Sequence, residues 1–155
     1  NSRIFKRITN EGHLVAIHAW THPDLTKLTK DEIKSQLQQT SSIIQKYSGK
    51  KPLLFRPPYG AMNEQVKQVV QNEGLTTIRW NIDTKDWQGP SPTRIIGRVS
   101  SQIVPGSIIL QHSAGGTRRL ESTVDALPEI IQLLKKQGYQ IVTLDELLHT
   151  PAYAN

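Results

Sequence analysis

Cysteine is absent from the sequence, which excludes disulfides, thiolate metal ligands and a cysteine nucleophile. Any bound metal ion would therefore be held by histidine and carboxylate side chains. Long apolar runs are also absent, because none approaches the ~18 residues that a membrane span requires. Aromatic residues make up only 6% of the chain, and the basic residues form no long run. We therefore expect neither a membrane span nor a nucleic-acid-binding tail in this sequence.

The remaining composition is that of a globular protein with an excess of positive charge. The 155 residues include 19 Lys and Arg against 13 Asp and Glu, which gives a formal net charge of +6. This length suits one domain with a single core, which we expect to span residues 1–155. The charge would suit a polyanionic neighbour such as nucleic acid, an anionic membrane or an anionic cell wall, and charge alone does not choose among them.

Short apolar runs alternate with amphipathic helical patterns along the whole chain. Strands are predicted at residues 14–17, 53–55, 76–82, 107–110 and 140–143. Helices are predicted at residues 1–10, 29–49, 63–74, 93–99, 122–137 and 145–149. Thr29 and Glu32 have the spacing of a capping box at the start of the second helix. The alternation predicts an α/β fold with a parallel sheet, open or closed into a barrel, and places the chemistry at the carboxyl ends of the strands.

Two histidines stand at the end of the first predicted strand. His18 and His22 lie four residues apart, directly after the apolar run 14–17. Neutral imidazole is a common Zn²⁺ ligand, and a catalytic zinc site usually has three protein ligands and a water molecule. The sequence shows two of those three ligands at this point. Two histidines beside an aromatic residue can also sit at the edge of a core, which is the alternative interpretation of the pair.

Polar or aromatic clusters also follow the next three predicted strands. They are Arg56-Pro57-Pro58-Tyr59-Gly60 after the second strand, Asp83 with Trp87 after the third, and Leu110 with His112 at the end of the fourth. Because the carboxyl ends of parallel strands share one edge, we expect the four clusters to meet and form one site. The structural alternatives are a rigid turn for the prolines, a turn or helix cap for Asp83 and a core position for His112.

In this order, the four clusters resemble the motifs of the NodB-type polysaccharide deacetylases, known as carbohydrate esterase family 4. His18-Ala-Trp-Thr-His22 is similar to the family's metal-binding HxxxH motif, and Arg56-Pro-Pro-Tyr-Gly is similar to its arginine loop. Asp83-x-x-Asp-Trp87 resembles its fourth motif, and Leu110-Gln-His112 resembles its leucine-histidine motif. The resemblance implies an irregular (β/α) barrel and a single deacetylase domain over residues 1–155.

One motif of this family has no counterpart in the sequence. In the family, a strand upstream of the other motifs ends in Thr-Phe-Asp-Asp, whose first aspartate is the general base and whose second is the third metal ligand. The sequence contains no such element, so we expect the chain to be N-terminally incomplete and to lack the first strand or strands of the barrel. The Asp-Asp pair would then be supplied upstream in the same polypeptide or by a separate chain. Ser113 is a second departure, because many relatives have aspartate there, and we expect it to matter little.

The resemblance assigns roles to the histidine pair and to the arginine loop. His18 and His22 would bind Zn²⁺, or another divalent cation such as Co²⁺, which would polarise the acetyl carbonyl and activate a water molecule. The backbone N–H of Tyr59 would stabilise the oxyanion. Pro57 and Pro58 would border the substrate and fix the backbone that aims this N–H.

The other motif residues would complete the proton-transfer chemistry and the acetyl pocket. His112 would act as general acid to the leaving amine, and Asp83 would orient and charge it. Trp87 and Leu110 would form walls of the acetyl pocket, with an ordinary core position as their alternative. Arg56 would pair with the absent general base.

The resemblance therefore implies metal-dependent hydrolysis of N-acetyl groups from a polymer of N-acetylglucosamine, either peptidoglycan or a chitin-like glycan. An enzyme of this kind would act outside the cell or in the bacterial cell wall. We expect the chain alone to be inactive, because the general base and the third ligand lie on the absent segment. The alternative is a non-catalytic carbohydrate-binding or scaffold protein, or an inactive fragment of the deacetylase. Nucleic-acid binding is favoured by the basic charge alone, so no nucleic-acid partner is expected.

Overall fold

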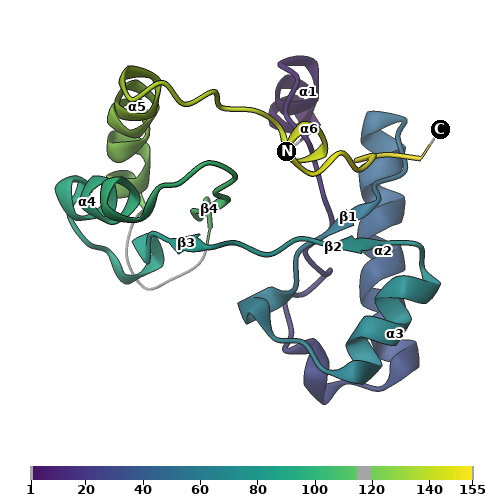
Figure 1. Cartoon of the computed structure of the whole chain (residues 1–155). Coiled ribbons are helices and arrows are strands. Elements are labelled where there is room, and N and C mark those ends of the chain that lie inside the picture. Colours follow the sequence, from purple (N-terminus) through teal and green to yellow (C-terminus); the bar gives the residue numbers. More distant parts are fainter. Residues whose placement is uncertain (1, 115–119, 155) are drawn as a thin grey trace. The chain divides into compact units, whose positions relative to one another are not determined.

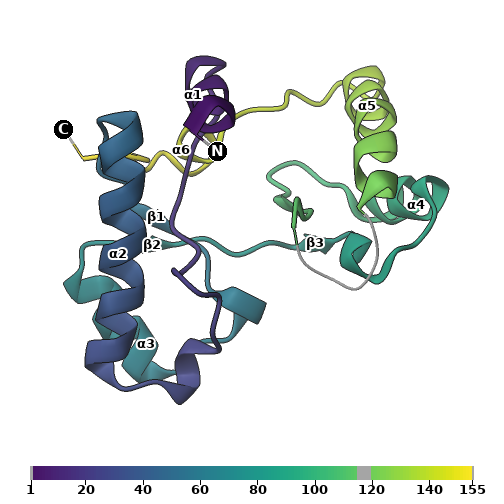
Figure 2. The same cartoon turned by 180° about the vertical axis from the view of Figure 1, so that it is seen from behind.

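The computed structural model describes residues 2–114 and 120–154 and divides the chain into two compact units. The first unit comprises Asn1–Arg79 and Thr143–Asn155, and the second comprises Trp80–Val142. Figures 1 and 2 show the elements of each unit from opposite sides, coloured along the sequence. Both units combine short parallel strands with helices, which confirms the predicted α/β class. Closure into a barrel and the single domain over residues 1–155 stay predictions.

The first unit is built around β1, which lies between two parallel neighbours. Its elements are α1 (Ser2–Asn10), α2 (Lys30–Ser48), β1 (Leu54–Phe55), α3 (Glu64–Asn72), β2 (Thr76–Thr77), α6 (Leu144–Leu148) and the 3₁₀ turns Leu25–Lys27 and Pro58–Gly60. On one edge of β1, the carbonyl of Phe55 accepts the backbone N–H of Ile78, which follows β2. On the opposite edge, the carbonyl of Leu54 accepts the backbone N–H of Ile17. The predicted strand 14–17 therefore contributes one bridge pair, Ile17 with Phe55.

The second unit contains the other parallel strand pair. Its elements are β3 (Ile82–Asp83), the 3₁₀ turn Asp86–Gln88, α4 (Pro92–Gln102), β4 (Ile109–Leu110) and α5 (Glu121–Lys136). β3 pairs with β4, and α4 and α5 lie side by side in both views (Figures 1 and 2). The predicted strand 76–82 is divided into β2 and β3, because its two ends pair with different partners.

The strand predicted at residues 140–143 does not form in the part of the chain that the structure describes. Extended backbone becomes a strand only where its N–H and C=O groups pair with a neighbouring segment. No such ladder forms along residues 140–143 among the described residues. The strand predicted from the apolar pattern of residues 140–143 is therefore wrong, because the pattern does not encode a pairing partner.

Local capping explains where two helices begin. Thr29 and Glu32 form the predicted capping box at the start of α2, with each side chain accepting the other residue's backbone N–H. The helix predicted from Thr93 begins instead at Pro92, with Ser91 as its N-cap. Proline suits this first position because an N–H there would have no acceptor within the helix.

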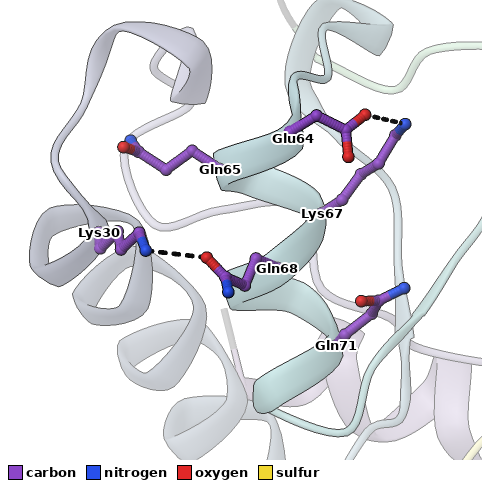
Figure 3. A pocket seen from close by; sticks show the side chains of 6 residues that line it. All are labelled: Lys30, Glu64, Gln65, Lys67, Gln68 and Gln71. Carbon is purple, nitrogen blue, oxygen red and sulfur yellow. Dashed lines mark hydrogen bonds and ion pairs between the residues drawn. The ribbon is translucent and has the colours of Figure 1, made fainter.

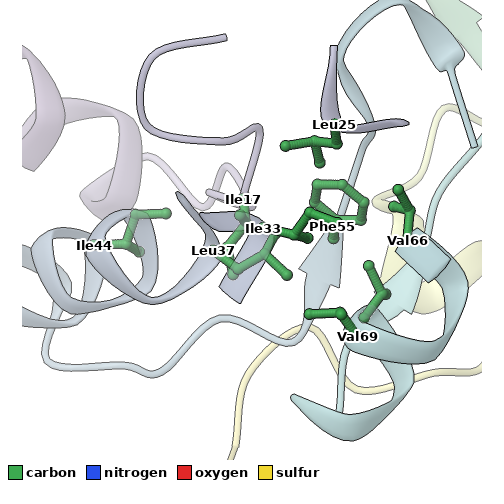
Figure 4. Packing of buried hydrophobic residues seen from close by; sticks show 9 residues of the cluster. Ile17, Leu25, Ile33, Leu37, Ile44, Phe55, Val66 and Val69 are labelled. Carbon is green, nitrogen blue, oxygen red and sulfur yellow. The ribbon is translucent and has the colours of Figure 1, made fainter. Parts of the chain in front are cut away.

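Each unit has its own hydrophobic core. In the first unit, side chains of α2 and α3 surround Phe55 (Figure 4), and the cluster comprises Ile17, Leu25, Ile33, Leu37, Ile44, Phe55, Val66, Val69 and Val70. In the second unit, β3, α4 and α5 bury Ile82, Ile95, Val99, Ala126, Ile130 and Leu134. Burial of one such large side chain contributes roughly 1.5–3 kcal/mol. Three of these residues, Ile17, Phe55 and Ile82, directly precede motif residues, so the cores anchor the segments that carry the candidate site.

The helix α1 lies at the surface of the first unit. None of its described residues is buried, and Ile4 and Ile8 are exposed. Its contact with α2 includes Phe5, whose ring centroid lies 6.0 Å from that of Tyr47. Among the described helices, none is both long enough and apolar enough to cross a membrane.

Candidate active site

His18 and His22 lie together at the end of the segment that bridges to β1. Their ring centroids are 4.9 Å apart, with the ring planes inclined at 75°. Nδ1 of His18 lies 2.6 Å from the carbonyl oxygen of Arg56. Because a carbonyl only accepts, Nδ1 carries the hydrogen and Nε2 carries the lone pair. In this tautomer a histidine can bind a metal ion through Nε2 while the backbone holds its other ring nitrogen.

The loop that carries the two histidines has a strained backbone. Ala19 has φ 66° and His22 has φ 58°, which is the left-handed region that residues with a side chain rarely adopt. Each such residue costs about 1–3 kcal/mol and persists only where surrounding contacts hold it. Residues of this kind gather at binding and catalytic sites, so the strain supports a functional role for the loop.

Gln36 of α2 supplies contacts that hold this loop. Its Oε1 accepts the backbone N–H of Trp20 at 2.8 Å and that of Thr21 at 2.9 Å. Its Nε2 donates to the hydroxyl of Thr21 at 3.0 Å. Gln36 was not predicted from the sequence, because nothing in a helical pattern distinguishes it from the other polar residues of α2.

The arginine loop places Tyr59 beside His22. Pro57 and Pro58 are buried, and Tyr59 in the following turn has φ 58°. The ring centroids of Tyr59 and His22 are 4.8 Å apart, and the Tyr59 hydroxyl donates to the carbonyl of His22 at 3.4 Å. Among the described residues, the backbone N–H of Tyr59 donates to no acceptor. An N–H on such a rigid turn suits the oxyanion role, which stays a prediction.

Arg56 connects the histidine pair to β1 through its backbone. Its N–H donates to the carbonyl of Ile17 at 2.9 Å, and its own carbonyl accepts from His18. The side chain is half-buried, and this burial lowers the pKa of the guanidinium, which stays protonated at neutral pH. Its pairing with a base aspartate stays a prediction.

In the second unit, His112 is paired with Asp86. Nδ1 of His112 lies 2.7 Å from Oδ1 of Asp86, and the backbone N–H of His112 donates to Oδ2, also at 2.7 Å. The Asp86 side chain is 0% exposed, whereas that of His112 is 25% exposed. Because an ionised carboxylate only accepts, the hydrogen lies on Nδ1, and Nε2 is the nitrogen left for proton transfer.

The prediction that Asp83 orients His112 is wrong. Oδ1 of Asp83 instead accepts the backbone N–H of Lys85 at 2.9 Å, which is the turn role considered as its alternative. Lys85 has a left-handed backbone, φ 51°, and directly precedes the 3₁₀ turn Asp86–Gln88. This change of chain direction brings Asp86 to His112, so the second aspartate of the motif takes the role predicted for the first.

Hydrogen-bond donors surround the buried carboxylate of Asp86. Besides the two from His112, the N–H of Trp87 donates to Oδ1 at 3.0 Å and the hydroxyl of Thr123 donates to Oδ2 at 2.9 Å. Burial raises the pKa of Asp86, but the hydrogen bonds from His112 and Thr123 outweigh burial and hold the pKa below its usual value of 3.8. Asp86 is therefore ionised at neutral pH and can stabilise a positive charge on His112.

Trp87 and Leu110 have different environments. Trp87 is 45% exposed, which suits a residue that faces a substrate. Leu110 is buried, and its carbonyl accepts from the hydroxyl of the buried Thr84 at 2.8 Å. Their roles as walls of an acetyl pocket stay predictions.

The described residues supply part of a metal site. In residues 2–114 and 120–154, no group of three or more His, Asp or Glu side chains is placed to hold a metal ion. His18 and His22, with His18 anchored in the liganding tautomer, fit two positions of a three-ligand zinc site. The chemistry of this donor set therefore fits a divalent cation that takes two of its protein ligands from this loop.

A polar surface hollow of about 490 Å³ lies between α2 and α3 (Figure 3), and no motif residue is among those that line it. It is lined by Lys30, Glu64, Gln65, Lys67, Gln68 and Gln71. Lys30 donates to Gln68 at 2.8 Å, and Lys67 pairs with Glu64. Each charged group of the hollow thus has a partner among the lining residues, and the hollow is not part of the candidate site.

The motif residues are divided between the two units. The first carries the histidine pair and the arginine loop, and the second carries the Asp86–Trp87 and Leu110–His112 segments. That the four clusters meet at one rim stays a prediction.

Residues 1–78, half of the chain, match the family model described as polysaccharide deacetylase. The chain belongs to this family. A relative in Bacillus cereus named peptidoglycan-N-acetylglucosamine deacetylase is 40% identical over 147 residues, which are 95% of this chain and 53% of the relative. This chain thus spans about half the length of that relative.

Solved structures of this deacetylase family share the fold. The Bc1960 peptidoglycan N-acetylglucosamine deacetylase has a TM-score of 0.92 and 38% identity, covering 98% of this chain and 71% of its own. BA3943, a pseudoenzyme of carbohydrate esterase family 4 from Bacillus anthracis, has a TM-score of 0.87 and 36% identity, covering 96% of this chain and 50% of its own. These matches confirm the resemblance to carbohydrate esterase family 4 and show that similar chains include a pseudoenzyme.

Proposed function

We propose that this chain serves the metal-dependent N-deacetylation of a polymer of N-acetylglucosamine, with peptidoglycan as the first candidate substrate. The observation that carries the proposal is the buried carboxylate of Asp86 held 2.7 Å from the imidazole of His112. Amide hydrolysis needs a proton delivered to a poor amine leaving group, whereas glycan binding needs no such pair. The name of the Bacillus cereus relative supports the choice of peptidoglycan.

His112 is the general acid of this reaction. Nε2 of His112 gives a proton to the departing amine nitrogen, while Asp86 holds the ring in the required tautomer and stabilises its cationic form. A positioned acid of this kind contributes roughly 10²–10⁴-fold to the rate. The partial exposure of His112 allows a substrate to approach it.

Tyr59 donates its backbone N–H to the oxyanion that develops on the acetyl group. Pro57 and Pro58 hold the turn from which this N–H projects, so the donor is oriented before substrate binds. Loss of one oxyanion donor typically costs about 10²-fold or more in rate. Trp87 and Leu110 border the acetyl methyl group.

His18 and His22 hold a divalent cation such as Zn²⁺ or Co²⁺ through their imidazole nitrogens. When bound, the cation polarises the acetyl carbonyl and lowers the pKa of a water molecule toward neutrality. The Arg56 carbonyl keeps His18 in the liganding tautomer. An Asp-Asp segment, upstream in the same polypeptide or on a separate chain, supplies the third ligand and the general base. Because the polymer belongs to the cell wall, the reaction takes place there or outside the cell.

A non-catalytic glycan-binding protein is the second candidate. It is favoured by the similarity to the pseudoenzyme BA3943 and by the two-histidine donor set among the described residues. Such a protein would bind the polymer and release no acetate.

Acetate release from N-acetylglucosamine oligomers with added Zn²⁺ or Co²⁺ tests the proposal. The chain is assayed alone, with a peptide bearing the Thr-Phe-Asp-Asp strand, and with the matched peptide in which both aspartates are asparagines. We expect release only with the Asp-Asp peptide, and loss of that release with a chelator. Oligomer binding without acetate release in all three mixtures would favour the glycan-binding candidate.

A further inference from the structure

The carboxylate of Asp86 receives one hydrogen bond from a helix that carries none of the predicted motifs. The hydroxyl of Thr123 donates to Oδ2 of Asp86 at 2.9 Å, although the two residues are 37 positions apart in the sequence. Both residues are buried, and Thr123 lies in the first turn of α5. The contact therefore links α5 to the pair formed by Asp86 and His112.

Packing of α5 in the second core sets the position of this hydroxyl. Ala126 and Ile130 follow Thr123 at helical spacing and are buried on the same face of α5. The backbone N–H of Thr123 donates to the carbonyl of Leu120 at 3.0 Å, which fixes the start of the helix. Because threonine is β-branched, few χ1 rotamers are populated in a helix. The hydroxyl is thus directed at Asp86 before any substrate binds.

The carboxylate of Asp86 can rotate about its Cβ–Cγ bond, so both oxygens must be held for the carboxylate plane to keep one orientation. Oδ1 faces Nδ1 of His112, while Oδ2 receives the backbone N–H of His112 and the hydroxyl of Thr123. A donor anchored in a packed helix opposes rotation of the carboxylate plane and so keeps one oxygen directed at Nδ1 of His112. The same hydrogen bond helps to hold the pKa of Asp86 low, after the larger contributions of burial, which raises it, and of His112.

We infer that Thr123 is a positioning residue for His112, a role that rests on the proposed deacetylase function. It acts through Asp86 on the tautomer and orientation of the imidazole.

The tautomer of His112 in the 155-residue chain provides a test that needs no activity. Thr123→Val removes the hydroxyl and keeps the branched shape, and Thr123→Ser keeps the hydroxyl. Ser122→Ala removes a hydroxyl from the adjacent position of α5 and is the matched control. Nitrogen-15 NMR of the labelled imidazole gives the ratio of the Nδ1–H to the Nε2–H tautomer, and circular dichroism verifies that each variant is folded.

We expect Thr123→Val to lower this tautomer ratio about 10-fold, as loss of one hydrogen bond to a charged group would. Thr123→Ser and Ser122→Ala should keep the ratio of the wild-type chain. An unchanged ratio in folded Thr123→Val would overturn the inference.

The second arm measures acetate release by the same variants mixed with the Asp-Asp peptide. Thr123→Val should lower kcat about 10-fold with KM unchanged, and Thr123→Ser should restore it. Equal kcat in Thr123→Val and wild type would also overturn the inference. If the wild-type mixture releases no acetate, the proposed function fails, while the tautomer ratio still decides whether Thr123 positions His112.

Discussion

Oδ1 of Asp86 lies 2.7 Å from Nδ1 of His112, and Oδ2 of the same carboxylate accepts the backbone N–H of His112 at the same distance. One buried anion thus holds both the ring and the backbone of a single histidine. Rotation of the ring and displacement of the strand end are both opposed by the same group. Changes to Asp86 are therefore expected to act on catalysis and on stability together.

Replacing Asp86 with asparagine should lower the deacetylase kcat by about 10- to 100-fold. The asparagine amide can donate a hydrogen bond toward Nδ1, which favours the tautomer in which Nε2 carries the hydrogen. Asp83→Asn is the matched control in the same loop and should have the smaller effect, because Asp83 contacts the Lys85 N–H. Acetate release in the presence of the Asp-Asp peptide measures both variants. Equal losses of kcat in the two variants would contradict the assignment of Asp86 as the residue that orients His112.

Replacing His112 with alanine should remove most of the kcat and leave KM little changed, because a general acid acts mainly in the transition state. The expected loss is about 10²–10⁴-fold. His149→Ala, which alters a histidine outside the motifs, serves as the control. Undiminished acetate release by His112→Ala would exclude His112 from the mechanism.

Acid should destabilise the chain partly through Asp86. Its pKa in the folded state lies below the usual 3.8, since the hydrogen bonds from His112 and Thr123 outweigh the opposing effect of burial. The ionised carboxylate therefore stabilises the folded state above this usual value, and the contribution is lost as the pH falls through the lower folded-state pKa. Urea unfolding from about pH 5 to about pH 2 measures this dependence.

Asp86→Asn should be less stable near neutral pH and should lose less stability on acidification than the wild-type chain. Hydrogen bonds from nearby threonines also lower the pKa values of Asp24, Glu32 and Asp145, but these residues are present in both proteins. The difference between the two pH profiles therefore isolates Asp86. Parallel pH profiles of stability for the wild type and Asp86→Asn would show that ionisation of Asp86 does not contribute to the acid sensitivity of the fold.

Zinc-edge anomalous scattering should place a divalent cation on His18 and His22 once the Asp-Asp segment is supplied, with nitrogen–metal distances of ~2.0–2.1 Å. The chain alone should bind zinc weakly, because two imidazoles lack the third ligand and its negative charge. Calorimetry compares the wild type with His18→Ala and with His13→Ala, the control at an exposed histidine. Tight stoichiometric binding by the chain alone, or metal bound elsewhere, would contradict this expectation.

Removal of the Gln36 contacts should loosen the loop between the two histidines. In Gln36→Leu, the amide hydrogens of Trp20 and Thr21 lose their shared acceptor, so their exchange with solvent should accelerate about 10-fold. Gln39→Leu, on the same helix, is the control because its side chain bonds to Ser35. Hydrogen exchange followed by NMR measures both variants. Equal exchange in Gln36→Leu and wild type would show that the loop is held by other contacts.

Local features of the sequence determined the α/β class, most helices and the residues of the motifs. Thr29 and Glu32 are three positions apart, so a capping box can be recognised from spacing alone, and the structure has it. Apolar periodicity likewise identified α2 and α3, because residues that share a helix face recur at fixed intervals. The histidine pair could be recognised in the same way, since its two residues stand in one short loop.

Only the tertiary structure decided which groups hold the motif residues. The choice of Asp86 over Asp83 depends on the left-handed backbone of Lys85, which no alternation of apolar and polar residues encodes. Thr123 reaches Asp86 from α5 across 37 positions, and Gln36 reaches the histidine loop from α2. These contacts exist because packed helices bring polar side chains to segments distant in sequence, and that packing is fixed by the cores rather than by local spacing.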